Sequence, residues 1–152
     1  MTTNNKLDKV FGPVGTLAGI FVFVAGLIIT YFSLTGLFLV FIGAFFGFSS
    51  TSTLIDFDKK RLKFSNNIFG IIQIGEWIYI QTDMKIGIKK SNKIWRAYSQ
   101  SNRTLDLEIN DYRLILYDFQ GKEIMPIQKL NNWASAKLNL DKLSNQLEIG
   151  VK

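Results

Sequence analysis

The chain has 152 residues and a formal net charge of +6, and it contains neither cysteine nor histidine. These absences exclude disulfides, thiolate metal sites and every nucleophile that a histidine would activate, so most hydrolytic chemistry lacks its usual residues. The basic charge suits a domain held against an anionic membrane. Nucleic-acid binding is the weaker interpretation because of the apolar segment near the N-terminus, and we expect no nucleic-acid partner.

That apolar segment covers residues 10–55, which carry no charge, whereas Lys9 precedes it and Asp56 follows it. A membrane crossing takes about 20 mostly apolar residues, so a run of this length suits two crossings joined by a short turn. A secretory signal peptide is a poorer interpretation, because its apolar region covers only about 7–15 residues. We therefore expect an integral membrane protein with a transmembrane helical hairpin over residues 11–50, preceded by a short cytoplasmic N-terminus over residues 1–10.

The two crossings are predicted over residues 12–29 and 34–50, with the turn at residues 30–33. Pro13 suits a first helical turn, where its missing N–H is not needed. Lys and Arg flank the hairpin at both ends and are absent from its turn. The positive-inside bias therefore places both termini in the cytoplasm, and two crossings independently require both termini to lie on one side of the membrane.

Each predicted helix carries three glycines on one face. They are spaced by four and seven residues in the first helix and by seven and four residues in the second. They are Gly15, Gly19, Gly26, Gly36, Gly43 and Gly47. In a hairpin turning at residue 31, Gly15 with Gly47, Gly19 with Gly43 and Gly26 with Gly36 would lie at equal depth. Small residues at matched depth let two helix backbones approach closely. We expect these glycines to pack the two helices together; the alternatives are a contact with the helices of another protein and no special role.

From residue 51 onward the pattern changes to short segments that are typical of strands. Residues 70–81 and 84–90 are rich in β-branched and aromatic side chains, and residues 104–109 alternate apolar and polar side chains. One hairpin reversal is expected around residues 58–60.

A second hairpin is expected to turn at Gly121. Pro126 donates no backbone hydrogen bond, so we place it at a sheet edge or a strand end. Residues 128–145 are predicted to form a helix. Residues 51–152 together predict a mostly antiparallel barrel or sandwich closed by a C-terminal helix. The expected fold class is therefore an α+β membrane protein, with the helical hairpin first and the β domain after it.

A resemblance to a group of small bacterial membrane proteins, chiefly from the Bacteroidota, rests on three segments and the C-terminal helix. The segments read STLIDFDKKRLKFSNNIFGIIQIGEW, YSQSNRT and YRLILYDFQGKEI. Those proteins pair a two-helix membrane hairpin with a C-terminal pleckstrin-homology-like (PH-like) domain, and the similarity covers nearly the whole chain. It implies a cytoplasmic PH-like β domain and a multi-pass location in the bacterial inner membrane. It implies no reaction, cofactor or catalytic residue.

Two basic clusters are candidate contact sites. The first follows the predicted second crossing and consists of Lys59, Lys60, Arg61 and Lys63. It should lie near the lipid headgroups, where each charge gains about 1 kcal/mol at an anionic leaflet. Either it binds anionic lipid, or it only fixes the topology and solvates a β-turn, which is the commoner role of such a cluster.

The second cluster comprises Lys85, Lys89, Lys90, Lys93, Trp95 and Arg96. We interpret it as a loop that contacts a protein partner or dips into the membrane interface. The alternative is that Trp95 belongs to the core, with solvated lysines around it.

Two carboxylate pairs, Asp56 with Asp58 and Asp106 with Glu108, are interpreted as solvated faces rather than acid/base or metal sites. No metal-ligand pattern or glycine-rich phosphate loop is recognisable in the sequence. We expect no catalytic residue, no cofactor and no metal. The leading hypothesis is a non-catalytic inner-membrane adaptor or accessory subunit that docks on a larger envelope complex through its helices and its PH-like domain. The runner-up is a membrane-anchored module that senses anionic lipid. A catalytic role has no positive support in the sequence.

Overall fold

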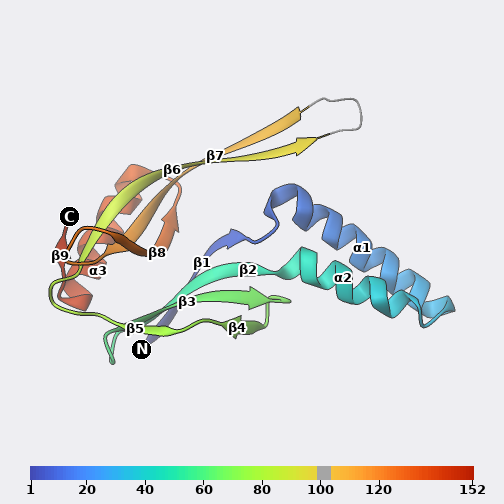
Figure 1. Ribbon diagram of the computed structural model, residues 1–152, viewed down its shortest axis with the longest axis horizontal. Coiled ribbons are helices and arrows are strands. Elements are labelled where there is room, and N and C mark those ends of the chain that lie inside the picture. The colour runs from blue at the N-terminus through green and yellow to red at the C-terminus, as the bar shows by residue number, and fades with distance from the viewer. Residues whose placement is uncertain (99–103) are drawn as a thin grey trace. The chain divides into compact units, whose positions relative to one another are not determined.

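A computed structural model describes residues 1–98 and 104–152, and shows an α+β chain (Figure 1). Apart from its two end residues, the YSQSNRT segment lies outside the described residues. The elements are β1 (Thr2–Lys9), α1 (Gly12–Phe32), α2 (Gly36–Phe48), β2 (Ser50–Asp56), β3 (Arg61–Ile68), β4 (Ile72–Ile74), β5 (Trp77–Tyr79), β6 (Lys85–Tyr98), β7 (Thr104–Tyr117), β8 (Glu123–Leu130), α3 (Trp133–Leu147) and β9 (Gly150–Val151).

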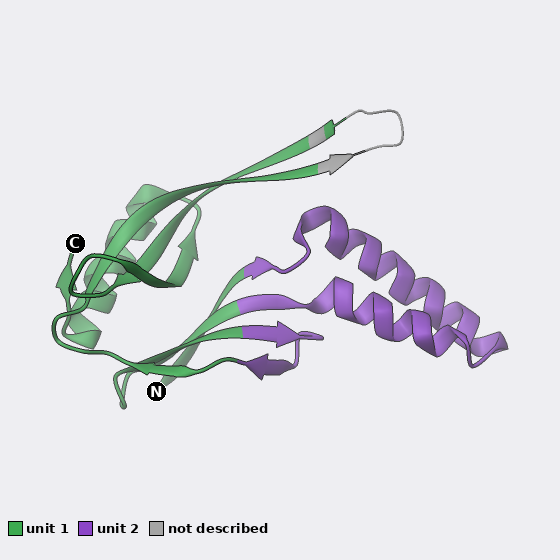
Figure 2. Cartoon of the chain, in the orientation of Figure 1, with its two compact units in different colours: residues 1–7, 52–65, 75–152 green, residues 8–51, 66–74 purple. Residues whose placement is uncertain are grey.

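The chain divides into two compact units (Figure 2). Unit 1 contains Met1–Leu7, Ser52–Ser65 and Gly75–Lys152, and therefore holds most of the strands and α3. Unit 2 contains Asp8–Thr51 and Asn66–Ile74, and therefore holds the two N-terminal helices and the turn between β3 and β4.

Most of the N-terminus expected over residues 1–10 forms strand β1, an element that the sequence analysis did not predict. β1 pairs with β2 in a sheet of order β1-β2-β3-β4, in which β5 also pairs with β3. Exposed and less exposed side chains alternate along β1, but its inward positions include Thr3 and Asn5, so the sequence shows little apolar alternation. The helical hairpin is thus inserted between two neighbouring strands of one sheet instead of preceding the β domain.

In unit 2, α1 extends three residues beyond its predicted end and the turn falls at residues 33–35. The hydroxyl of Thr30 donates a hydrogen bond to the carbonyl oxygen of Gly26 at 2.7 Å, so Thr30 can lie within the helix with its polar group hydrogen-bonded. Ser33 is extended and ends α1. The Ser33 and Thr35 hydroxyls lie 2.9 Å apart, and the Gly36 N–H donates to the Ser33 carbonyl at 3.1 Å.

The two helices differ in length. α1 has 21 residues and is long and apolar enough, by length and composition, to cross a membrane. α2 has 13 residues, which correspond to about 20 Å of helix, whereas a hydrocarbon core is about 30 Å thick. The predicted second crossing over residues 34–50 is therefore not supported as a full-length span. Its helix ends at Phe48 because the hydroxyl-rich residues that follow enter β2.

Five of the predicted glycines are buried where α1 and α2 meet: Gly19, Gly26, Gly36, Gly43 and Gly47. A Cβ built on Gly26 would lie 2.6 Å from the backbone nitrogen of Val40, and one on Gly43 would lie 2.5 Å from Phe23 Cα. Real side chains essentially never approach backbone atoms so closely, so these positions admit only glycine. Gly15 differs, because its added Cβ would meet Phe11 at the start of its own helix.

The register of the two helices differs from the predicted pairing. Gly43 and Gly36 do lie near the carbonyl oxygens of Gly19 and Gly26, but their Cβ positions point at Phe23 and Thr30, four residues further along α1. Gly47 lies against Ile20 and Gly19 and does not meet Gly15. The offset is about one helical turn, and it arises because the hairpin reverses at residues 33–35 rather than at residue 31.

The rest of unit 1 contains a sheet of order β8-β7-β6-β9 and α3. β6 and β7 are antiparallel along their whole length, from Lys85 opposite Tyr117 to Tyr98 opposite Thr104. Pro126 lies in β8, at the edge of the sheet as predicted. The predicted helix over residues 128–145 begins later, at Trp133, because Asn132 caps it by accepting from the Ser135 N–H at 2.7 Å. The core contains Ile55, Leu62, Met84, Ile86, Leu114, Leu116, Met125, Ile127, Leu140, Leu143, Leu147 and Ile149.

Replacing Gly43 by leucine should separate the helices, because the new side chain would overlap the backbone of α1. We expect the free energy of unfolding to fall by at least ~2 kcal/mol, which is as much as overpacking substitutions in protein cores cost, or more. Ala18→Leu is the matched control, since Ala18 is exposed on α1. Unfolding followed by circular dichroism in mild detergent compares the two variants, and equal stability of Gly43→Leu and wild type would contradict the close helix contact.

Candidate functional site

The outer surface of the helical hairpin is apolar on both helices. Phe21 on α1 is 75% exposed and Phe38 on α2 is 76% exposed. Other exposed apolar side chains of the two helices include Leu17, Val24, Leu27, Ile28, Leu37, Phe41 and Ile42. Soluble monomers rarely expose contiguous apolar patches beyond a few hundred Å², so this surface is suited to contact with lipid or with apolar helices.

The first basic cluster lies in the turn between β2 and β3, with Lys59 and Lys60, and at the start of β3, with Arg61 and Lys63. Lys60 forms an ion pair with Glu148, and the Arg61 Nε donates to Asp56 at 3.0 Å. The Arg61 guanidinium also stacks over Trp77, at 4.2 Å from the ring centroid, and Lys63 lies 5.9 Å from the same ring. Three of the four cations therefore already have partners inside unit 1.

Asp56 shows how firmly this turn is held. Its burial alone would raise the pKa of the carboxyl, but hydrogen bonds from the Arg61 side chain and the Lys59 N–H outweigh burial and hold that pKa below its usual value. The expectation that the charges of the first basic cluster lie near the lipid headgroups stays a prediction.

The second basic cluster lies on a strand, β6, and not in a loop as predicted. Strand alternation places Lys85, Lys89, Lys93 and Trp95 on one face and Lys90 and Arg96 on the other. Lys89 pairs with Glu123, and Arg96 forms a two-pronged ion pair with Asp106 at 2.8 and 2.9 Å. Trp95 is half-buried and lies opposite Leu107, outside the main core cluster.

These residues belong to what we call the β6–β7 arm, residues 91–98 and 104–111. β8 pairs with β7 only from Tyr112 onward, and β9 pairs only with Lys85 and Ile86. Among the described strand pairings, the arm is therefore a two-stranded ribbon (Figure 1). Trp95, Leu107 and Ile109 are half-buried and share one face of it. A two-stranded ribbon is only marginally stable alone in water, so this face is suited to a partner.

A buried charge cluster holds the base of the arm. Asp111 is 1% exposed and accepts from Arg113 Nε at 2.7 Å and Nη2 at 3.0 Å, while Lys129 Nζ lies 3.2 Å from the second Asp111 oxygen. Burial alone would raise the pKa of Asp111, but the two cations outweigh burial and lower it. Sequence reasoning missed this cluster; the alternation that places Asp111 and Arg113 on one face was visible, but Lys129 comes from another strand.

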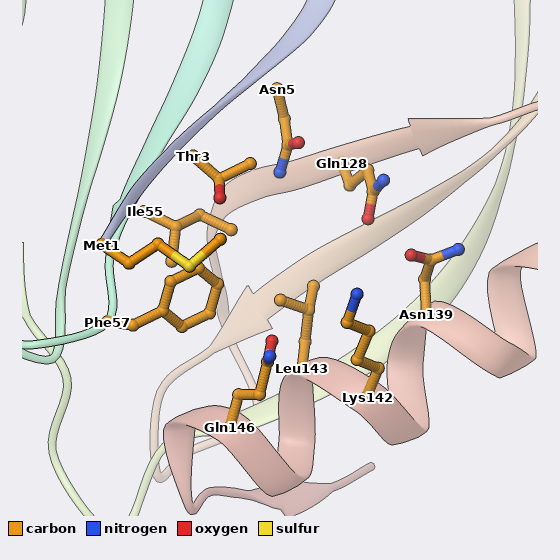
Figure 3. A pocket seen from close by; sticks show the side chains of 10 residues that line it. All are labelled: Met1, Thr3, Asn5, Ile55, Phe57, Gln128, Asn139, Lys142, Leu143 and Gln146. Atoms are coloured by element: carbon orange, nitrogen blue, oxygen red, sulfur yellow. The ribbon is translucent and has the colours of Figure 1, made fainter.

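A small pocket in unit 1 lies between β1, β2, β8 and α3, with a volume of about 190 Å³ (Figure 3). Ile55, Phe57 and Leu143 provide apolar lining, and Lys142 projects from α3 at its polar side. The other lining residues are Met1, Thr3, Asn5, Gln128, Asn139 and Gln146. Ligand sites usually measure about 300–1,000 Å³, so this pocket suits a single side chain or terminus better than a metabolite.

Among the described residues, no group of three acidic, histidine or cysteine side chains is placed to hold a metal ion. No protein-family model matches the chain. Neither a curated protein nor a solved structure shows detectable similarity to it. The candidate surfaces are therefore assigned from their geometry alone.

Replacing Asp111 by asparagine should destabilise the β domain, because Arg113 and Lys129 would keep their burial and lose their counter-charge. Removing one partner of a buried ion pair typically costs roughly 3–5 kcal/mol. Chemical denaturation in mild detergent at neutral pH measures the loss. Asp106→Asn serves as the control, because its pair with Arg96 is exposed and should contribute little.

The pH dependence follows from the lowered pKa of Asp111. Its contribution to stability is complete above the unfolded pKa of about 3.9 and is lost as the pH falls through the lower folded value. Wild type should therefore lose this stability below pH ~4, and Asp111→Asn should lack that part of the acid transition. An identical acid transition in both proteins would contradict the assignment.

Proposed function

We propose that this chain is a membrane-anchored, non-catalytic adaptor whose helical hairpin inserts into the bilayer and whose β domain binds a protein partner. The observation that carries the proposal is the helical hairpin itself. Residues 10–55 are uncharged, and both helices expose large apolar side chains around a glycine-packed contact. Exposing such an apolar surface to water costs free energy, whereas a helix that crosses a membrane requires an apolar surface toward the lipid.

The placement of the helical hairpin within the sheet supports one topology. α1 follows β1 and α2 leads into β2, and these strands are neighbours in one sheet. The Val10 N–H donates to the Ser49 carbonyl at 3.3 Å, which joins the two ends of the hairpin. Both ends therefore leave the membrane on the same side. The lysines and arginines on that side favour the cytoplasmic face, in the proposal the face of a bacterial inner membrane.

The β domain supports the adaptor role by its shape and by what it offers a partner. Its curled sheets and C-terminal helix are compatible with the PH-like fold that the resemblance implies. The Trp95 face of the β6–β7 arm is the docking surface in this proposal, because tryptophan is enriched among the residues that dominate binding energies. The partner that we propose is a protein of a larger envelope complex, as in the leading hypothesis from the sequence.

Internal pairing of the first basic cluster favours the adaptor over the lipid sensor. Lys60 and Arg61 are engaged by Glu148 and Asp56, and an anionic headgroup would have to compete with these carboxylates. The small pocket of unit 1 fits the same proposal, since its volume suits one side chain of a partner.

Purification of the tagged, full-length chain in mild detergent, followed by mass spectrometry of the intact assembly, should show a protein partner at a fixed ratio. Trp95→Ala should weaken its capture at least tenfold, because interface tryptophans commonly contribute about 2 kcal/mol or more. The control is Ile94→Ala, since Ile94 neighbours Trp95 on the opposite face of the same strand.

Each result decides between the alternatives. Equal capture by the Trp95→Ala and Ile94→Ala variants would remove the arm from the docking surface. A wild-type chain that emerges without protein but with bound anionic lipid would contradict the adaptor and support the lipid sensor. A chain that emerges with neither would contradict both functions.

A further inference from the structure

The turn between β3 and β4 has an apolar composition that a soluble β-turn does not require. Residues 64–75 carry no charge. Ile71 is 82% exposed, Ile72 54% and Ile74 53%. Single exposed apolar residues are common on protein surfaces, but three exposed isoleucines so close together form a small apolar surface that indicates a contact site.

The backbone of this turn is strained, because an aromatic residue in it adopts a left-handed conformation. Phe69 and Gly70 both have positive φ, 55° and 72°, and the Ile71 N–H donates to the Ile68 carbonyl at 3.2 Å. β-turns in which both central residues have positive φ favour Asn, Asp and Gly there, because a left-handed conformation costs most other residues about 1–2 kcal/mol. Phenylalanine thus occupies a position where asparagine would be easier to accommodate.

The turn belongs to unit 2 and continues the apolar surface of α2. The Phe69 ring lies 5.8 Å from the Phe45 ring, and the Phe69 N–H donates to the Ser49 hydroxyl at 3.3 Å. A Cβ on Gly70 would lie 3.2 Å from the Phe48 carbonyl oxygen. The turn therefore lies against the last turn of α2, at the point where this short helix ends.

We infer that the β3–β4 turn is a second membrane-contacting element, with Ile71 and Ile72 in the boundary between headgroups and acyl chains. The inference rests on the proposed membrane anchor. It also explains how a 13-residue helix can serve in that anchor, because the turn extends the apolar surface beyond Phe48. The bilayer is the occupant favoured by this continuity and by the lack of charge in residues 64–75.

The absence of native cysteine allows a clean test with single cysteines in the full-length protein. Ile71→Cys, Phe38→Cys and Phe119→Cys are each labelled with an environment-sensitive dye and reconstituted into vesicles with acyl-brominated lipids. Phe38 reports on the helical hairpin. Phe119 is the matched control, an apolar residue on another β-turn that is 69% exposed and has charged neighbours.

We expect quenching at positions 71 and 38 and none at position 119. Bromine near the headgroup end of the acyl chain should quench position 71 more than bromine near the methyl end. Since Ile71 is largely exposed, its substitution should leave the fold intact, which circular dichroism checks.

The other outcomes overturn the inference in distinguishable ways. Quenching at position 38 but not at 71 would overturn it and leave the membrane anchor standing. A label at position 71 that is shielded from water yet not quenched by lipid would show that a protein surface covers the turn. Quenching at neither position 38 nor 71 would overturn the anchor as well, and equal quenching at 119 and 71 would show that the dye alone seeks lipid.

Discussion

Backbone contact between α1 and α2 requires glycine where the helices meet, and the helical hairpin between β1 and β2 depends on that contact. Gly43 and Gly26 lie against backbone atoms of the opposite helix and leave no room for a side chain. In lipid the hydrophobic effect does not drive helices together, so close van der Waals packing must hold them. Packing the two helices together keeps the ends of the helical hairpin close, which favours the pairing of β1 with β2.

The sheet and the helical hairpin therefore support each other. β1 precedes the hairpin and β2 follows it, so forming the sheet closes a long loop whose entropy cost is lowered once the helices are packed. In return, the bond between Val10 and Ser49 fixes both ends of the hairpin. The chain therefore enters the helical hairpin from one strand of the sheet and leaves it into the neighbouring strand.

Sequence reasoning could find what is local and periodic. The uncharged run and the glycine faces indicated a helical hairpin, the alternation over residues 104–109 indicated a strand, and Gly121 indicated the turn of a β-hairpin. It could not find β1, whose polar residues hide its alternation, or the helix register, which depends on Ser33 and Thr35 rather than on the more conspicuous Tyr31. The buried contacts of Asp111 were out of reach because Lys129 approaches from another strand. The Phe69-Gly70 turn was missed because phenylalanine is an unexpected residue at positive φ.

Membrane insertion of the helical hairpin is the central claim, and alkaline carbonate extraction of membranes from cells that express the full-length chain tests it most directly. High pH strips proteins that are held at the surface by charge, whereas an inserted apolar hairpin remains with the lipid. We predict that the chain stays in the membrane pellet after extraction and enters the soluble fraction only with detergent. Release of folded protein into the carbonate supernatant would contradict the account.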